Sequence, residues 1–157
     1  MRTAIGLVLL LTTLHLNANA ASTTRVFESG AAPVTLVELY TSEGCSSCPP
    51  ADRYLSGLES APGLWKDFVP VALHVDYWDD IGWPDRFASR DYSDRQRRYA
   101  HEGGTRVVYT PGLFRNGQEW RGWRLGGPGR SRGAAVGALS VESDGARFSA
   151  RFEPAAG

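Results

Sequence analysis

Residues 34–52 read Val34-Thr-Leu-Val-Glu-Leu-Tyr-Thr-Ser-Glu-Gly-Cys-Ser-Ser-Cys-Pro-Pro-Ala-Asp52. They predict a strand that is followed by a helix. The run Val34–Tyr40 is rich in β-forming residues and mostly apolar on both faces, which favours a central strand covered on both sides. Apolar residues then recur at helical spacing from Ala51 to Leu58, and Pro62-Gly63 predicts the end of that helix. A second strand is expected over 68–76. Together these elements predict a parallel βαβ unit with a right-handed crossover.

Two further elements follow the βαβ unit. Ser93-Asp-Arg-Gln96 matches the capping box, in which a Ser hydroxyl and a Gln side chain satisfy backbone donors at a helix start. It predicts a helix from about Ser93 to Glu102 that Gly103-Gly104 ends. Asn116-Gly117 lies between two strand-like triplets in 113–120 and predicts an antiparallel hairpin.

The C-terminal part of the chain and its division by composition come next along the sequence. A second hairpin is expected around Ser143-Asp-Gly145. Because two strands alone are marginal in water, they are expected either to pack on the main domain or to begin a β-module that this chain does not finish. The parts are a signal peptide (1–20), a polar lead (21–32), the α/β domain (33–121), a Gly/Arg-rich linker (122–133) and a C-terminal β-hairpin segment (134–157).

Length and composition limit the function classes. The chain has 157 residues and 17.1 kDa, which leaves room for about one domain of ~100–200 residues. Hydrophobic residues at 42% and charged residues at 22% exclude a disordered chain. The 17 basic residues balance the 17 acidic ones, so neither nucleic acid nor an anionic membrane is an expected partner. The two Cys lie three positions apart and can form one local site.

The first twenty residues predict export. Arg2, the apolar run Ala4–Leu11 and the sequence Ala18-Asn-Ala20 match the charged end, the apolar core and the cleavage site of a secretory signal. The apolar run is shorter than the ~18 residues that a membrane-spanning helix needs, so no membrane span is expected after cleavage. The mature chain is predicted to be secreted, into the periplasm of a Gram-negative source, where a Cys pair can persist as a disulfide.

The segment Cys45-Ser-Ser-Cys48 is the candidate catalytic site. A C-x-x-C sequence between a strand and a helix is typical of redox dithiols. Unpaired N–H groups and partial positive charge at a helix start lower a thiol pKa, which predicts Cys45 as the nucleophile and Cys48 as the residue that resolves a mixed disulfide. Pro49-Pro50 weakens this effect, because with Cys48 as the N-cap Cys45 lies just before the helix.

Two other interpretations of the Cys pair stay open. An inert structural disulfide requires no further residue. Half of a metal site requires two more ligands, and the candidates His74 and His101 show no ligand-type spacing. Copper(I) favours thioether ligands, but Met1 is the one Met in the chain and leaves with the signal. No metal ligand is therefore predicted.

Glu38 and Pro111 are further candidate catalytic residues. A carboxylate in an apolar strand must be protonated or hydrogen-bonded, so Glu38 is expected either to exchange a proton with Cys48 or to be a structural acid paired with an Arg. The Thr110-Pro111 bond precedes the hairpin strand, and a cis bond there would expose backbone groups that pair with an extended substrate. The sequence by itself favours an ordinary trans bond.

An acidic and aromatic segment follows the second predicted strand. Asp76-Tyr-Trp-Asp-Asp-Ile-Gly-Trp-Pro84 lies at a strand end, where loops often carry function. Trp78 and Trp83 are expected either to contact substrate or to cover a small core.

The order of elements over residues 33–121, with a Thr-Pro pair before a strand and an Asn-Gly hairpin, resembles the thioredoxin superfamily. In finer detail the chain is similar to the secreted thioredoxin-like proteins grouped as domain-of-unknown-function family 1223. The motifs that carry this second resemblance are Val37–Asp52, His74-Val-Asp-Tyr-Trp78 with Gly82-Trp83, Arg95-Gln96 and Val108-Tyr-Thr-Pro111.

The resemblance implies a thioredoxin-like α/β fold, with a mixed sheet flanked by helices. It implies Cys45 and Cys48 as the dithiol and Pro111 as a cis-proline, and Tyr109 and Thr110 beside it are expected substrate contacts. It brings no established substrate. The chain departs from the pattern in two ways: the closing helix is missing or reduced to 132–139, and the β-rich region that family members usually continue into stops at Gly157.

The leading hypothesis is an exported thiol–disulfide oxidoreductase that exchanges its dithiol with protein thiols or disulfides. The Cys45–Cys48 disulfide is then the only redox group, no organic cofactor is needed, and a partner protein supplies or removes electrons. The alternatives are a non-catalytic thioredoxin-like binding module with a structural disulfide, and a metallochaperone that uses the Cys pair.

Overall fold

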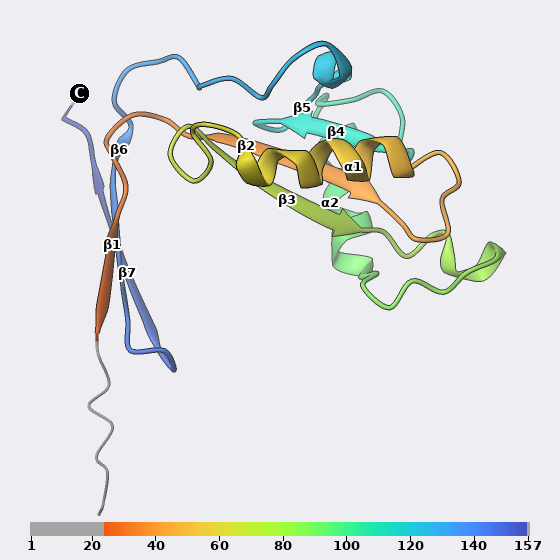
Figure 1. Ribbon diagram of the computed structural model, residues 1–157, viewed down its shortest axis with the longest axis horizontal. Helices are drawn as coiled ribbons and strands as arrows, with labels where there is room; N and C mark the ends of the chain where they lie inside the picture. The colour runs from red at the N-terminus through yellow and green to blue at the C-terminus, as the bar shows by residue number, and fades with distance from the viewer. Residues whose placement is uncertain (1–23, 157) are drawn as a thin grey trace, which may run out of the picture.

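The computed structural model describes residues 24–156 (Figure 1), so the predicted signal peptide lies outside the described residues. No helix within 24–156 is both long and apolar enough to cross a bilayer. Three short 3-10 helices, Leu58–Ser60, Asp79–Ile81 and Arg121–Leu125, supplement the main elements. These are β1 (Arg25–Glu28), β2 (Thr35–Thr41), α1 (Pro49–Gly57), β3 (Phe68–His74), α2 (Arg90–His101), β4 (Gly112–Arg115), β5 (Gln118–Glu119), β6 (Gly137–Ser143) and β7 (Phe148–Pro154).

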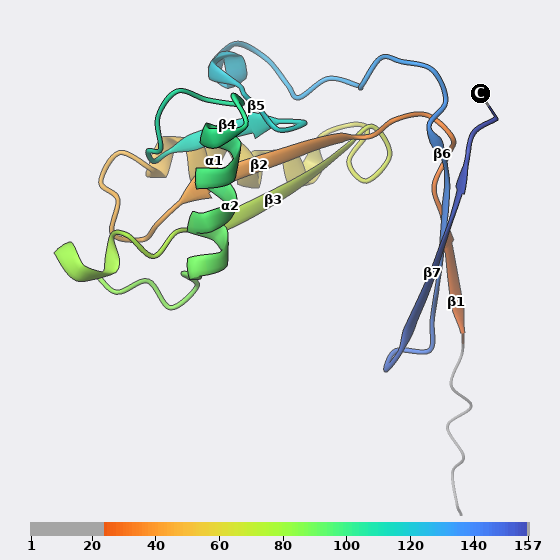
Figure 2. The same ribbon diagram turned by 180° about the vertical axis from the view of Figure 1, so that it is seen from behind.

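The α/β unit is built on a four-stranded mixed sheet in the order β3-β2-β4-β5. Strands β2 and β3 are parallel, and β4 runs antiparallel to both β2 and β5. Helices α1 and α2 lie on opposite faces of this sheet, as the front and back views show (Figures 1 and 2). The predicted fold class, a mixed sheet flanked by helices as in thioredoxin-like α/β proteins, is confirmed.

Strand β2 is the centre of the unit because both of its faces are covered. Successive side chains of a strand point to opposite faces. On the α1 face Val37 and Leu39 pack in one apolar cluster that includes Ala51 of α1. On the α2 face Tyr40 packs with Phe114 and is in a second cluster with Val75. The apolar run on both faces therefore encodes a central strand, as its composition predicts.

Helix α1 begins as predicted, with Cys48 as its N-cap and Pro49 at the first helical position. Proline suits that position because its missing N–H has no intrahelical partner there. The helix ends at Gly57 and continues as the 3-10 turn 58–60. Gly63 then reverses the chain at φ +87°, a conformation that favours glycine.

Helix α2 differs from its predicted start. It begins at Arg90, and Ser89 is the N-cap, whose side chain accepts a hydrogen bond from the Asp91 N–H at 3.3 Å. The capping box placed Ser93 and Gln96 at the helix start, but both are buried in the middle of α2. Their side chains accept hydrogen bonds from the segment that follows β3. The predicted C-terminal end is confirmed, because α2 stops at His101.

The turn between β4 and β5 forms at Asn116-Gly117, as predicted, and both residues have positive φ (51° and 79°). Such φ values match the turns that join two-residue hairpins. The Thr110–Pro111 peptide bond just before β4 is cis. The prediction of a trans bond, which the sequence by itself favours, is therefore wrong, and the cis-proline that the resemblance implies is confirmed.

A second, three-stranded sheet of order β1-β6-β7 stands beyond one end of the α/β unit (Figure 1). The predicted hairpin forms β6 and β7, but the lead 21–32 also supplies strand β1, which pairs antiparallel with β6. Residues 132–139 form no helix, since β6 begins at Gly137. One face of this sheet is apolar, with four large side chains between 41% and 76% exposed: Phe27, Leu139, Phe148 and Phe152.

The predicted linker is held against the α/β unit. Its first residues belong to the 3-10 helix 121–125. Trp123 packs on Tyr54 of α1 with ring centroids 5.3 Å apart. Further along, the Arg130 guanidinium lies 2.7 Å from Asp67, and the Ser131 hydroxyl lies 2.8 Å from the buried Thr35 hydroxyl.

Substitution of Gly104 tests the packing of α2 against the hairpin. A Cβ atom at this position would lie 2.2 Å from the carbonyl oxygen of Gly117, which is fixed backbone. We expect Gly104→Ala to lower the free energy of unfolding by about 1–3 kcal/mol, the usual cost of overpacking. Gly127→Ala is the control, because a Cβ there meets open space. Urea denaturation measures both variants, and equal midpoints would contradict the close packing.

Candidate functional site

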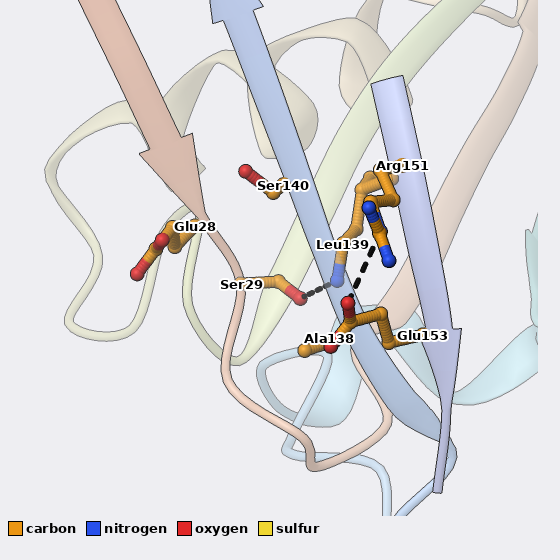
Figure 3. A pocket seen from close by; sticks show the side chains of 7 residues that line it. All are labelled: Glu28, Ser29, Ala138, Leu139, Ser140, Arg151 and Glu153. Carbon is orange, nitrogen blue, oxygen red and sulfur yellow. Dashed lines mark hydrogen bonds and ion pairs between the residues drawn. The ribbon is translucent and has the colours of Figure 1, made fainter.

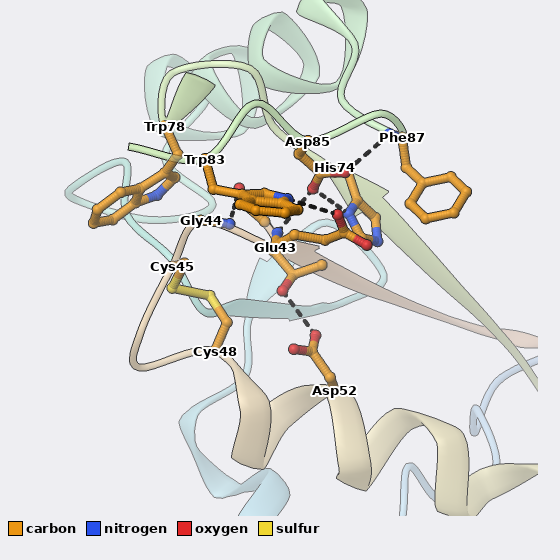
Figure 4. A network of polar contacts seen from close by, with 12 residues as sticks. Glu43, Gly44, Cys45, Cys48, Asp52, His74, Trp78, Trp83, Asp85 and Phe87 are labelled. Carbon is orange, nitrogen blue, oxygen red and sulfur yellow. Dashed lines mark hydrogen bonds and ion pairs between the residues drawn. A yellow bond between two sulfur atoms is a disulfide. The ribbon is translucent and has the colours of Figure 1, made fainter. Parts of the chain in front are cut away.

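The two Cys residues form a disulfide where the central strand β2 leads into helix α1 (Figure 4). The sulfur atoms are 2.07 Å apart, and the Cα atoms are 5.4 Å apart. Cys48 is fully buried, and Cys45 is 3% exposed. The residue predicted as the nucleophile is thus covered in the disulfide state.

The start of α1 has few free hydrogen-bond donors. The Cys48 N–H donates to the Cys45 carbonyl at 3.2 Å, and Pro49 and Pro50 carry no N–H. The Ala51 N–H donates to the Cys48 carbonyl at 2.8 Å. All four N–H positions that a helix normally leaves unpaired are therefore absent or occupied. The prediction that unpaired N–H groups stabilise a Cys45 thiolate is wrong for this helix.

A side-chain donor lies close to Cys45 instead. The Ser47 hydroxyl oxygen is 3.5 Å from the Cys45 sulfur and can donate a hydrogen bond to a thiolate. The remaining electrostatic contribution is the helix dipole, which falls off within the first turn.

The loop with the cis-proline is held by α2 and by the segment that follows β3. Gln96 of α2 donates from its side-chain amide to the Tyr109 carbonyl at 2.7 Å. The Trp78 indole N–H donates to the Thr110 hydroxyl at 2.8 Å. Pairing of β4 with β2 begins only at Gly112, so Thr110 and Pro111 precede the strand ladder.

Trp78 joins this loop to the segment that precedes Cys45. A Cβ atom added to Gly44 would lie 3.5 Å from the Trp78 Cβ and 3.1 Å from the Trp83 carbonyl oxygen. Trp78 is partly buried, and Figure 4 shows its ring on the Cys45 side of this contact. The structure therefore brings Trp78, Thr110 and the Cys45 loop together. Gln96 was missed as a positioning residue because its sequence context indicated a helix cap.

Trp83 lies at the rim of the site. Its side chain is 63% exposed, and its indole N–H donates to the Glu43 carboxylate at 3.1 Å. Figure 4 shows it over the Glu43-Gly44 segment.

A buried carboxylate, Asp85, holds the backbone ahead of Cys45. Asp85 accepts the Glu43 N–H at 2.9 Å, the His74 Nδ1 at 2.6 Å and the Phe87 N–H at 2.9 Å (Figure 4). Burial raises the pKa of Asp85, but these three donors outweigh it and hold the pKa below its ordinary value. No sequence signal singles out Asp85, because its partners lie 42, 11 and 2 residues away.

Glu38 lies on the other side of the sheet from the disulfide. Its carboxylate accepts hydrogen bonds from Arg95 Nε at 2.6 Å and from the Tyr99 hydroxyl at 2.8 Å, both on α2. Cys48 caps α1, on the opposite face. Glu38 therefore faces away from Cys48, and the alternative of a structural acid paired with an Arg is confirmed.

Another acid, Asp52, lies on the α1 face. It is four residues after Cys48, and its N–H donates to the Cys48 carbonyl at 3.1 Å. The Thr41 hydroxyl at the end of β2 donates to the Asp52 carboxylate at 2.7 Å. Figure 4 shows this carboxylate directed from α1 toward the end of β2. Asp52 was missed because a carboxylate in the first turn of a helix is common for electrostatic reasons alone.

Other parts of the surface offer little chemistry. Within residues 24–156 no three His, Cys, Asp or Glu side chains gather in a way that could hold a metal ion. A depression of about 410 Å³ lies on the second sheet, away from the disulfide (Figure 3). Its one cation, Arg151, pairs with Glu153 at 3.1 Å, and its Ser29 hydroxyl accepts the Leu139 N–H at 2.8 Å.

The family described as protein of unknown function DUF1223 matches residues 36–131, which contain the Cys pair, Trp78, Trp83 and the cis-proline. The chain belongs to the DUF1223 family. The DUF1223 assignment covers the α/β unit and leaves the second sheet outside the matched range.

A solved structure is similar to this DUF1223 chain. It is the X-ray crystal structure of a protein from Agrobacterium tumefaciens, with 32% sequence identity and a TM-score of 0.53. The alignment covers 69% of this chain and 55% of that chain, so this chain spans little more than half the length of the similar protein. A search of curated proteins finds no match.

The Asp85 network predicts how stability depends on pH. Because the pKa of Asp85 is lower in the folded chain, its carboxylate stabilises the fold above the ordinary pKa, and this contribution is lost as the pH falls through the folded pKa. At pH 7 we expect Asp85→Asn to cost about 1–3 kcal/mol, because buried donors lose a charged acceptor.

Urea denaturation at pH 7 and in the acid range measures this effect. Asp85→Asn should also show a smaller loss of stability than the wild type on acidification. Asp80→Asn is the matched control, since Asp80 is exposed in the same loop. Identical behaviour of the two variants would contradict a role of Asp85 in holding the loop.

Proposed function

We propose that this protein is a thiol–disulfide oxidoreductase that exchanges the Cys45–Cys48 pair with thiols or disulfides of other proteins after export. The observation that carries the proposal is the position of the pair. It links the end of the central strand to a helix start, and Trp78 joins it to the cis-proline loop. We expect backbone groups before β4 to align an extended substrate segment beside the pair.

The reaction in the reducing direction balances in two steps. The Cys45 thiolate attacks one sulfur of a substrate disulfide, forms a mixed disulfide and releases the first substrate thiolate. Cys48 loses its proton and attacks the Cys45 sulfur, which re-forms the Cys45–Cys48 bond and releases the second thiolate. The substrate gains two electrons, and the protein dithiol loses two. A reduced dithiol protein must then supply two electrons for the next cycle.

Asp52 is the proposed acceptor for the Cys48 proton. It follows Cys48 by one helical turn, on the face of the sheet that holds the disulfide, and the Thr41 hydroxyl orients its carboxylate. A positioned general base typically contributes 10²–10⁴-fold to the rate of a proton transfer.

A pair of isosteric variants tests this assignment. We expect Asp52→Asn to slow the second step at least about tenfold near neutral pH, with the loss shrinking at alkaline pH, because hydroxide then removes the proton. We expect Glu38→Gln to leave this step unchanged and to lower the free energy of unfolding by about 1–3 kcal/mol, because it weakens a buried ion pair. Rapid-quench kinetics of the mixed disulfide measure the step. Equal rates for Asp52→Asn and wild type would remove Asp52 from the mechanism.

The helix start favours the reducing direction. Strong oxidants of this class owe their potential to a stabilised reduced form. Here Pro49 and Pro50 leave the helix start without the N–H donors that would stabilise a thiolate. The helix start thus adds little to the stability of the reduced form, and we infer that the disulfide is comparatively hard to reduce.

Equilibration with glutathione buffers tests both the activity and its direction. We expect a potential of about −230 to −270 mV, between those of glutaredoxins and thioredoxin, with exchange that Cys45→Ser abolishes. Alkylation followed by mass measurement quantifies the disulfide. A potential above about −180 mV would contradict the argument from the prolines.

A second candidate function has one observation in its favour. Cys45 is only 3% exposed, which suits a binding module whose disulfide is a structural clasp. In that case the same equilibration gives no exchange, or a potential below about −300 mV, and the oxidoreductase proposal fails.

A further inference from the structure

A groove of about 240 Å³ begins at the cis-proline and extends toward α1. Leu113 and Pro111 contribute apolar surface to it. The groove is smaller than the ~300–1,000 Å³ of typical small-molecule sites, so it suits one or two side chains of a larger partner. We call it the Pro111 groove. Its lining residues are Tyr109, Pro111, Leu113, Trp120, Arg121, Trp123 and Arg124.

The walls of the Pro111 groove are packed against the α/β unit. Tyr54 of α1 contacts both tryptophans, with ring centroids 6.0 Å from Trp120 and 5.3 Å from Trp123. The Tyr109 hydroxyl donates to the Glu119 carboxylate, and Gln96 holds the Tyr109 carbonyl. These contacts fix the groove before a partner arrives, which lowers the entropy cost of binding.

Two of the residues that line the Pro111 groove, Arg121 and Arg124, carry positive charge. The Arg124 guanidinium lies 4.8 Å from the Trp123 ring centroid. Arg115 lies outside the lining, 5.4 Å from the Trp120 ring centroid, and donates to the Pro128 carbonyl at 3.3 Å. Arg121 pairs with Glu119 at 3.2 Å. In the part of the chain that the structure describes, neither Arg115 nor Arg124 forms an ion pair. Stacking on an aromatic ring leaves the edge of a guanidinium free to bind a carboxylate through two N–H groups.

We propose that the Pro111 groove binds the segment next to the reacting cysteine of a protein substrate and selects segments with acidic side chains. This inference rests on the proposed oxidoreductase function and names its substrate class. The substrate lies extended along Thr110-Pro111, its apolar atoms cover the two tryptophan rings, and its carboxylate binds Arg124. Arg121, which also lines the groove, adds attraction for acidic segments and repulsion for basic ones.

Three peptides of equal length test the selectivity. Each has one cysteine bonded to 2-mercaptoethanol as a mixed disulfide, flanked by Glu, Gln or Lys, and each reacts with the reduced protein. Bis(2-hydroxyethyl) disulfide is the small neutral reference. We expect the Glu peptide to react roughly tenfold faster than the Lys peptide at low salt, with the Gln peptide between them. The difference should shrink in 1 M salt, because salt screens exposed charges.

Charge-reversed variants assign the selectivity to the groove. We expect Arg124→Glu to lower the Glu-to-Lys rate ratio at least about threefold, and the double variant with Arg121→Glu to invert it. Each rate is divided by the rate of the same variant with the neutral disulfide. Arg98→Glu is the matched control, because it makes the same charge change on an exposed residue of α2, across the sheet, and should keep the wild-type ratio.

The outcomes separate the two proposals. If the wild type does not reduce the neutral disulfide, the proposed oxidoreductase function fails. If it does, but the three peptides react equally fast, the acidic selectivity of the Pro111 groove is wrong. A wild-type ratio that Arg98→Glu lowers as much as Arg124→Glu would show that net charge, and not the groove, governs the rate. Arg124→Gln, which removes the charge without reversing it, gives the same test if Arg124→Glu does not fold.

Discussion

Six of the seven side chains of β2 are buried, and because alternate residues point to opposite faces, this strand determines what each side of the molecule can do. The face of Val37 and Leu39 packs on α1 and ends at Thr41, which binds Asp52 below the disulfide. The face of Glu38 and Tyr40 packs on α2, where the Glu38 carboxylate is neutralised by Arg95. The disulfide and Asp52 thus lie on one face of the sheet, and the Glu38–Arg95 ion pair lies on the other. Glu38 therefore makes no direct contact with the Cys pair.

Polar contacts from the segment between β3 and α2 complete the site. Asp85 binds the backbone before Cys45, and Trp78 binds the hydroxyl next to the cis-proline. Gln96, from α2 itself, fixes the carbonyl on the other side of that loop. Each of these side chains binds backbone or a loop residue, and in the described residues none of the three forms a hydrogen bond with the disulfide. The geometry of the site therefore depends on the contacts that hold three segments together: the one before Cys45, the one between β3 and α2, and the cis-proline loop.

Much of the fold could be predicted because its signals are local. The apolar run of β2, the Pro49 helix start and the Asn116-Gly117 turn each lie within a few residues of the element that they specify. The errors arose where tertiary contacts decide. Ser93 and Gln96 match a cap, but burial between α2 and its neighbours turns them into partners of distant groups. The pairing of β1 with β6 joins residues more than 100 positions apart, and no pattern in either segment specifies the other.

Because β1 pairs with β6, the α/β unit is an excursion from a β-sheet that both flanking segments build together. The Ser29 N–H donates to the Leu139 carbonyl at 2.8 Å, and the Val136 N–H donates to the Ala31 carbonyl at 2.9 Å, so the chain enters and leaves the unit side by side. The family match at 36–131 falls within this excursion. The α/β unit has its own sheet and core and is joined to the second sheet by two adjacent chain segments. A unit that is connected in this way can be inserted between two neighbouring strands of a different sheet without a change in its own core.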